Sequence, residues 1–214
     1  MSTGALLSLG EAETVACQLA AEMRPYCERL EIAGSIRRRK PEVRDIELVA
    51  IPEWTQATGA PQGCLFGAPT ERRNMLHSWA LSPECPVRWI KPGTSEVIDW
   101  KPKEDGRYWR GRLASGAQLD LFLATPENFG LIYLIRTGSA DFSQALVTFA
   151  RRCGYVVNEG RLLRPATEWV DAHLIPTPEE QDVFAALRLE WVEPEHRTGW
   201  DALKALKALK AVTR

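Results

Sequence analysis

Two acids separated by a single residue lie in an apolar segment early in the chain. Asp45 and Glu47 alternate with Ile46 and Leu48 within residues 45–51. If this segment is a strand, both acids lie on one face and the apolar side chains on the other. Neighbouring carboxylates repel each other unless a cation holds them together, and hard oxygen ligands suit Mg²⁺. The pair therefore predicts a divalent metal site.

A Gly-Ser turn and a basic run come before the acid pair. Gly34-Ser35 ends a short apolar stretch, and residues 37–40 are all basic. The backbone N–H groups of such a turn, together with nearby cationic side chains, suit a phosphate. A phosphate cradle beside a metal-binding acid pair indicates phosphoryl or nucleotidyl transfer.

Two-metal phosphoryl transfer also needs a third carboxylate. Asp99 and Asp120 each lie inside an apolar segment that reads as a strand. Asp120 has the cleaner pattern, since the leucines around it would share the opposite face. Asp99 is followed closely by Lys101, with which it could simply pair. The local pattern favours Asp120 without deciding between the two.

The composition describes a globular protein. Of 214 residues 45% are hydrophobic, and the net charge of −1 gives no global basic field for nucleic acid. Five cysteines, an odd number without a CxxC pair, favour reduced thiols and argue against a disulfide framework or a structural zinc site. We find no pattern of a signal peptide or membrane span, and we expect a cytoplasmic, reducing environment.

Periodicity and turn residues divide the chain into two domains and a tail. We expect one domain over 1–125, a second over 126–200 and a Lys/Leu/Ala helical tail over 201–214, with a loop/helix segment of unknown role at 53–95. Predicted helices cover 8–24, 70–81 (Thr70 as N-cap), 127–135, 140–152 and 179–189. Predicted strands cover 30–33, 45–51, 87–91, 96–101, 107–113 and 118–124, the last three as an antiparallel meander, with a hairpin at 155–163 and a loop at 53–69.

Taken together, these motifs resemble those of a known family. Gly34-Ser35, with acids ten and twelve residues after Ser35, resembles the nucleotidyltransferase signature of X-family DNA polymerases, typified by DNA polymerase beta. A Thr-Gly-Ser turn begins seventeen residues after Asp120, which is the family's spacing. Later segments resemble the family's thumb: 157–159, 164–165, 180–184 and 193–197. These matches are collinear, and they select Asp120 over Asp99.

The resemblance implies a fold and a site. The fold class is α+β: a nucleotidyltransferase palm with a mixed β-sheet flanked by helices, followed by a small, mostly helical thumb. The implied catalytic residues, which are also the ligands of Mg²⁺ or of substituting Mn²⁺, are Asp45, Glu47 and Asp120. The implied nucleotide-binding residues are Gly34, Ser35, Arg38, Arg44, Arg136, Thr137, Gly138, Ser139 and Ser143. The other basic residues beside Arg38 are expected at the surface.

The resemblance also implies an activity. We expect a Mg²⁺-dependent DNA polymerase that adds dNMP to a primer 3′-hydroxyl and releases pyrophosphate, in short-gap filling or DNA repair. The expected partners are primer–template or gapped DNA and deoxynucleoside triphosphates, with no membrane, and we expect a monomer. The family's amino-terminal lyase domain has no counterpart in the sequence, so deoxyribose-phosphate lyase activity is not expected.

Some positions depart from the family pattern. Glu47 stands where these polymerases usually have Asp, and Ile135-Arg136 replaces an aromatic pair that helps to exclude a ribose 2′-hydroxyl. A template-independent or ribonucleotide-tolerant nucleotidyltransferase is therefore the alternative, and an inactive nucleic-acid-binding module is a remote one. Among the tryptophans, Trp109 has basic neighbours and is the best candidate for base stacking.

Overall fold

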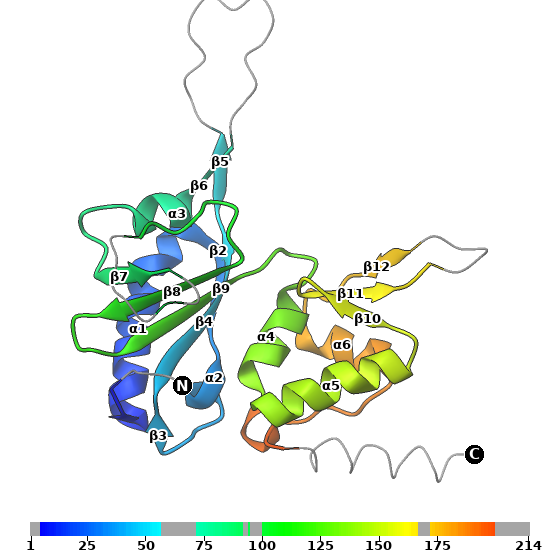
Figure 1. Cartoon of the computed structure of the whole chain (residues 1–214). Helices are drawn as coiled ribbons and strands as arrows, with labels where there is room; N and C mark the ends of the chain where they lie inside the picture. Colours follow the sequence, from blue (N-terminus) through cyan, green and yellow to red (C-terminus); the bar gives the residue numbers. More distant parts are fainter. Residues whose placement is uncertain (1–4, 57–71, 92–93, 95–99, 167–171, 200–214) are drawn as a thin grey trace, which may run out of the picture.

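A five-stranded sheet forms the centre of the amino-terminal lobe. The computed structural model describes residues 5–56, 72–91, 94, 100–166 and 172–199, and Figure 1 shows two lobes. The sheet has the order β2-β4-β9-β8-β7. The β4–β9 pair is parallel and the other neighbours are antiparallel, so the predicted mixed sheet is confirmed. Its strands are β2 (Cys27–Ile32), β4 (Asp45–Pro52), β7 (Val87–Ile90), β8 (Tyr108–Leu113) and β9 (Gln118–Leu123).

One face of this sheet packs on helices. Helix α1 (Leu9–Met23) begins after Ser8 as predicted, because Ser8 and Glu11 form a capping box. It ends where Pro25 predicts, and a 3₁₀ turn follows over Arg24–Tyr26. The apolar side chains of α1 and α3 (Met75–Ala80) form one core with the sheet residues that alternate with the acids.

Several local predictions were wrong in extent or type. Helix α3 is shorter than the predicted 70–81 helix and takes Asn74 as its N-cap; Thr70 lies outside the described residues. Part of the predicted 53–69 loop is strand, since β5 (Trp54–Gln56) pairs with β6 (Arg72–Asn74). Most of the predicted 96–101 strand and the whole tail lie outside the described residues. A further short pair joins β1 (Leu7–Ser8) to β3 (Glu42–Val43).

The carboxyl-terminal lobe has its own apolar core. Three helices pack there beside a three-stranded sheet (Figure 1). The helices are α4 (Phe129–Thr137), α5 (Ala140–Arg152) and α6 (Glu180–Ala186), and the strands are β10 (Val156–Asn158), β11 (Arg161–Arg164) and β12 (His173–Ile175). A 3₁₀ turn covers Pro194–His196. No helix in the described part of the chain is long and apolar enough to cross a membrane.

A buried ion-pair network joins the two lobes. The Glu180 carboxylate accepts hydrogen bonds from Arg197, whose side chain is fully buried, and from Arg37 of the amino-terminal lobe, at 2.7 and 2.8 Å. Arg37 also donates to the Thr137 hydroxyl and lies over the Tyr133 ring. The expectation that Arg37 is a surface charge was therefore wrong, because its partners come from a distant segment.

This network makes a prediction about stability. Glu180→Gln leaves the buried Arg197 without its countercharge, so we expect the free energy of unfolding to fall by about 3–5 kcal/mol. The neighbouring Glu179→Gln is the matched control, because Glu179 pairs with Arg29 at the surface and should lose less than about 1 kcal/mol. Urea denaturation followed by tryptophan fluorescence measures both; equal losses would contradict the inferred role of the buried pair.

Candidate active site

Three carboxylates share the sheet face that looks toward the carboxyl-terminal lobe. Asp45 and Glu47 lie on one face of β4, and the parallel register pairs Glu47 with Asp120 of β9. Paired residues of neighbouring strands project to the same face, with the strands about 4.8 Å apart. Further along this face, Phe122 packs in one cluster with Phe129 of α4. We call the surface that carries the three acids the acid face.

The acid face is electrostatically costly without a cation. Burial, and after it the neighbouring carboxylates of Asp45 and Asp120, raises the pKa of Glu47 from 4.5 to about 7. Burial and the Asp120 carboxylate also raise the pKa of Asp45. The Arg38 guanidinium lowers both pKa values but does not cancel these effects. A divalent cation at this place would favour the ionised form of every carboxylate.

Asp120 differs from the other two acids because its oxygens are already engaged. Its Oδ1 accepts from the Tyr108 hydroxyl and from Arg110 Nε, both at 2.7 Å. Its Oδ2 accepts from Arg110 Nη2 at 3.0 Å and from Gln118 Nε2 at 3.3 Å. Within the described residues, no group of three or more His, Cys, Asp or Glu side chains is arranged to hold a metal ion.

Gly34 and Ser35, predicted as a turn, begin the short helix α2 (Gly34–Arg37) and lie directly against Glu47; we keep the name Gly-Ser turn for these two residues. A Cβ at Gly34, which has φ +65°, would stand 2.0 Å from Glu47 Oε2, so this position requires glycine. The Ser35 hydroxyl and Arg38 Nε are buried without a hydrogen-bond partner among the described residues. Such orphaned donors are expected where a ligand supplies the acceptors. Arg44 is exposed and directly precedes Asp45 in the chain.

The predicted nucleotide-binding residues of the carboxyl-terminal lobe already make bonds within the protein. Arg38 Nη1 donates to the Thr137 carbonyl, and the Ser139 hydroxyl caps α5 by accepting from the Phe142 N–H at 3.2 Å. The Ser143 hydroxyl donates to the Ile135 carbonyl at 2.7 Å. A Cβ at Gly138 would clash with the Phe142 ring, at 2.4 Å. The structure therefore brings Thr137 to the Gly-Ser turn and directs Ser139 and Ser143 inward.

Arg136 lies between the acid face and an apolar cleft. Its guanidinium stacks on the Phe122 ring at 3.9 Å and is attracted to Glu47. The Phe122 ring in turn stacks on Tyr108, with centroids 5.0 Å apart. Beside this stack a cleft of about 390 Å³ opens between β8, β9, α4 and the β10–β11 turn. A flat ring could enter this cleft beside Arg136.

Sequence reasoning missed Arg110 and Tyr108 and chose the wrong residue of their strand. Trp109 is fully buried, and its indole N–H donates to the Lys103 carbonyl, so it is a core residue and not a stacking platform. Alternation along β8 puts Tyr108 and Arg110 on the opposite face, beside Asp120. The Tyr-x-Arg spacing was the available signal. Asp99, the rejected third acid, lies outside the described residues.

The raised pKa of Glu47 predicts how stability depends on pH. The folded protein binds the Glu47 proton more tightly than the unfolded chain does, so ionisation costs stability as pH rises from about 4.5 to about 7. Glu47→Gln removes this cost. In EDTA, we expect the variant to match the wild type near pH 4 and to be more stable by about 3 kcal/mol at pH 8. A difference that is constant across this range in urea denaturation would contradict the assignment.

Comparison with known proteins identifies the carboxyl-terminal lobe. Residues 132–198 match the family model of the DNA polymerase beta thumb. A search of curated proteins found no match. The matched region is less than a third of the chain and begins after all three acids. The predicted thumb is therefore confirmed as similar to that of polymerase beta, and this similarity suggests a role related to X-family polymerases and DNA binding in general.

Proposed function

We propose that this protein is a Mg²⁺-dependent DNA polymerase of the X-family type, which adds dNMP to a primer 3′-hydroxyl and releases pyrophosphate. One observation carries the proposal. The β4–β9 register puts Asp45, Glu47 and Asp120 on the sheet face that looks toward a lobe similar to the polymerase beta thumb. Three acids at the meeting point of such lobes are the donor set that two-metal nucleotidyl transfer requires.

The residues on the acid face fit a metal-bound triphosphate. Asp45 and Glu47 are hard oxygen donors whose pKa values are raised by burial and by the neighbouring carboxylates, and a divalent cation would counter both effects. The orphaned donors of Ser35 and Arg38 adjoin them on the Gly34 side. Asp120 fits as a third ligand once its bonds to the β8 side chains are exchanged.

Each group has a task in the proposed reaction. Asp45, Glu47 and Asp120 would hold Mg²⁺. When bound, Mg²⁺ would lower the pKa of the primer 3′-hydroxyl and neutralise charge on the triphosphate. Ser35 and Arg38 donate to the triphosphate and fix the leaving pyrophosphate on the β4 side of the site. The fixed donors stabilise the charge that develops during in-line attack at the α-phosphate.

The proposal includes the substrates and the setting. Primer–template or gapped DNA and deoxynucleoside triphosphates are the substrates, and Mn²⁺ would substitute for Mg²⁺ at the carboxylates. We place the activity in short-gap filling or DNA repair, carried out by a monomer in a reducing, cytoplasmic compartment. The thumb match supports DNA as the partner, and an inactive DNA-binding module is the reading that an activity assay has to reject.

Primer extension tests the proposed activity. A labelled primer–template with Mg²⁺ and four dNTPs should be extended by the wild type, and Asp45→Asn should lower the rate by at least about 100-fold, because a ligand of the reacting centre is lost. Asp105→Asn is the matched control, since Asp105 lies in an exposed turn, and it should retain full activity. No extension by the wild type, or equal extension by Asp45→Asn, would reject the proposal.

A second candidate is transfer that tolerates ribonucleotides or a missing template. Two observations favour it: Arg136 stacks on Phe122 where the resembled family has an aromatic residue, and the Ser143 hydroxyl is engaged with Ile135. We expect Arg136→Phe to raise the preference for dNTP over NTP about tenfold by closing space beside the sugar. Single-nucleotide incorporation on templated and single-stranded primers measures this. A wild type that strictly requires both template and dNTP would reject this candidate.

A further inference from the structure

Neighbouring side chains occupy both oxygens of Asp120, the third carboxylate of the acid face. Asp120 is 7% exposed, and its two oxygens accept four hydrogen bonds, from Tyr108, Arg110 twice and Gln118. A carboxylate has about four lone-pair sites, so these donors fill it. The Arg110 contact is bidentate, which is the strongest arrangement of such a pair. A cation can reach Asp120 only if this pairing is given up.

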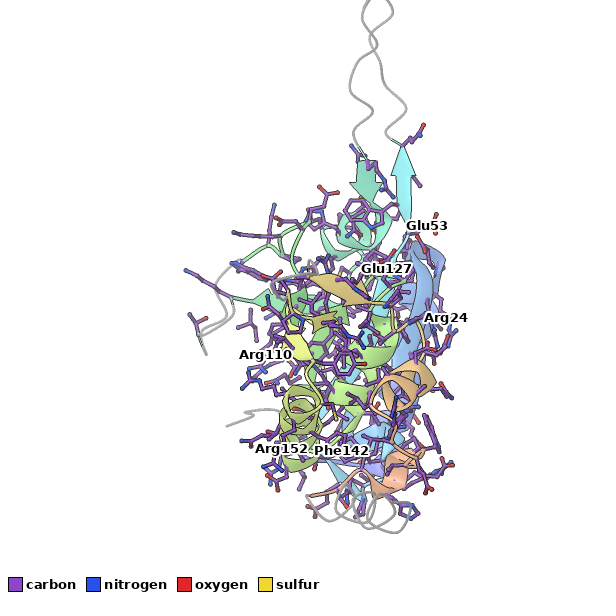
Figure 2. All side chains as sticks on the ribbon, turned by 90° about the vertical axis from the view of Figure 1, so that its right-hand side faces the viewer. Arg24, Glu53, Arg110, Glu127, Phe142 and Arg152 are labelled. Carbon is purple, nitrogen blue, oxygen red and sulfur yellow. The ribbon has the colours of Figure 1, made fainter. Side chains whose placement is uncertain are left out.

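Arg110 is much more exposed to solvent than Asp120, the acid that it pairs with. Its side chain is 39% exposed, whereas Asp120 is buried, so the guanidinium can turn outward without leaving water. Figure 2 labels Arg110 toward one edge of the packed side chains. Burial of the Asp120 end and exposure of the Arg110 end make this pair a contact that an outside anion can open.

The geometry of the acid face indicates which anion this would be. The orphaned donors of Ser35 and Arg38 lie on the β4 side of the acids, whereas Arg110 lies on the β8 side. In-line attack brings the nucleophile from the side opposite the leaving group. The strand that carries the attacking hydroxyl would therefore arrive over β8 and β7, where Arg110 shares a face with Arg112 and Arg88. A nucleic-acid strand brings phosphates to these cations.

We propose that Arg110 locks Asp120 out of the metal site until a phosphate of the bound nucleic-acid strand takes over its guanidinium. The lock rests on the proposed function, since it assumes that the acid face binds a divalent cation. It explains why the three acids share a face and yet form no ready metal cluster in the described protein. Strand binding and metal binding then strengthen each other, because each one releases the partner of the other.

Metal binding to the DNA-free protein tests the lock directly. Arg110→Gln frees Asp120, and we expect the affinity for Mn²⁺, measured from the electron paramagnetic resonance signal of free Mn²⁺, to rise about tenfold. Arg88→Gln is the matched control, because it removes the same charge from the same sheet face two strands away from Asp120, and it should leave the affinity nearly unchanged. Circular dichroism verifies the fold of each variant, and Arg110→Lys, which loses the bidentate fork, provides a second variant with a smaller expected rise.

The outcomes separate the lock from the proposed function. Unchanged or weaker Mn²⁺ binding by Arg110→Gln would overturn the lock, since Arg110 would then position Asp120 for the metal or play no part. An equal rise in the Mn²⁺ affinity of Arg88→Gln would overturn the lock as well, because the effect would then come from the loss of positive charge on the sheet face and not from the Arg110–Asp120 pair. If the wild type binds Mn²⁺, the polymerase proposal stands even when one of these two results overturns the lock. No Mn²⁺ binding by any variant would overturn both.

Reciprocity gives a second measurement on the same lock. Fluorescence anisotropy of a labelled single strand should show that Mg²⁺ tightens DNA binding by the wild type relative to Arg110→Gln and Asp120→Asn. Both variants lack one member of the exchanged pair, so neither can couple the two ligands. The same Mg²⁺ response in all three proteins would contradict the exchange.

Discussion

The parallel pairing of β4 with β9 is the contact on which the candidate site depends. It joins segments about seventy residues apart in the sequence and puts Glu47 beside Asp120. A shift of one residue would turn Asp120 to the α1 side of the sheet, where its charge would meet the apolar core. The hydrophobic alternation of both strands therefore fixes the register, and the register fixes which acids meet.

Bringing these acids together has a cost that shapes the rest of the site. Burial, and after it the like charges, raise the pKa values of Glu47 and Asp45, and cations from three elements lie near enough to lower them in part. Arg38 comes from the turn after β2, Arg110 from β8 and Arg136 from α4. The arginines thus offset only part of the charge of the acid face in the free protein, and substrate phosphates and metal ions would replace some of these contacts.

Buried ion pairs anchor the carboxyl-terminal lobe to the amino-terminal lobe. Glu180 receives Arg37 from the amino-terminal lobe and the buried Arg197 from its own lobe. This places Thr137, which also accepts from Arg37, next to the Gly-Ser turn. The same contact that docks the lobes therefore sets the distance from the Gly-Ser turn to the thumb residues, so stability and site geometry depend on one network.

The local sequence pattern predicted much of the fold and the positions of the three acids, but it did not predict which arginines pair with the acids of the protein. Period-two alternation was enough to find β4 and β9 and to put Asp45 and Glu47 on one face. The role of Arg110 depends on the antiparallel register of β8 with β9, and that of Arg37 on docking between lobes, and neither is encoded in a nearby residue. Trp109 was misjudged because basic neighbours suggest exposure, whereas alternation in β8 turns the indole into the core.

A metal site on the acid face would draw its ligands from two strands, β4 and β9. Anomalous diffraction from crystals grown with Mn²⁺, a dNTP and a dideoxy-terminated primer–template would show such a site. We expect anomalous peaks roughly 2.0–2.3 Å from carboxylate oxygens of Asp45, Glu47 and Asp120, with Arg110 moved to a phosphate. Anomalous peaks elsewhere, with Asp120 still paired to Arg110, would contradict this expectation.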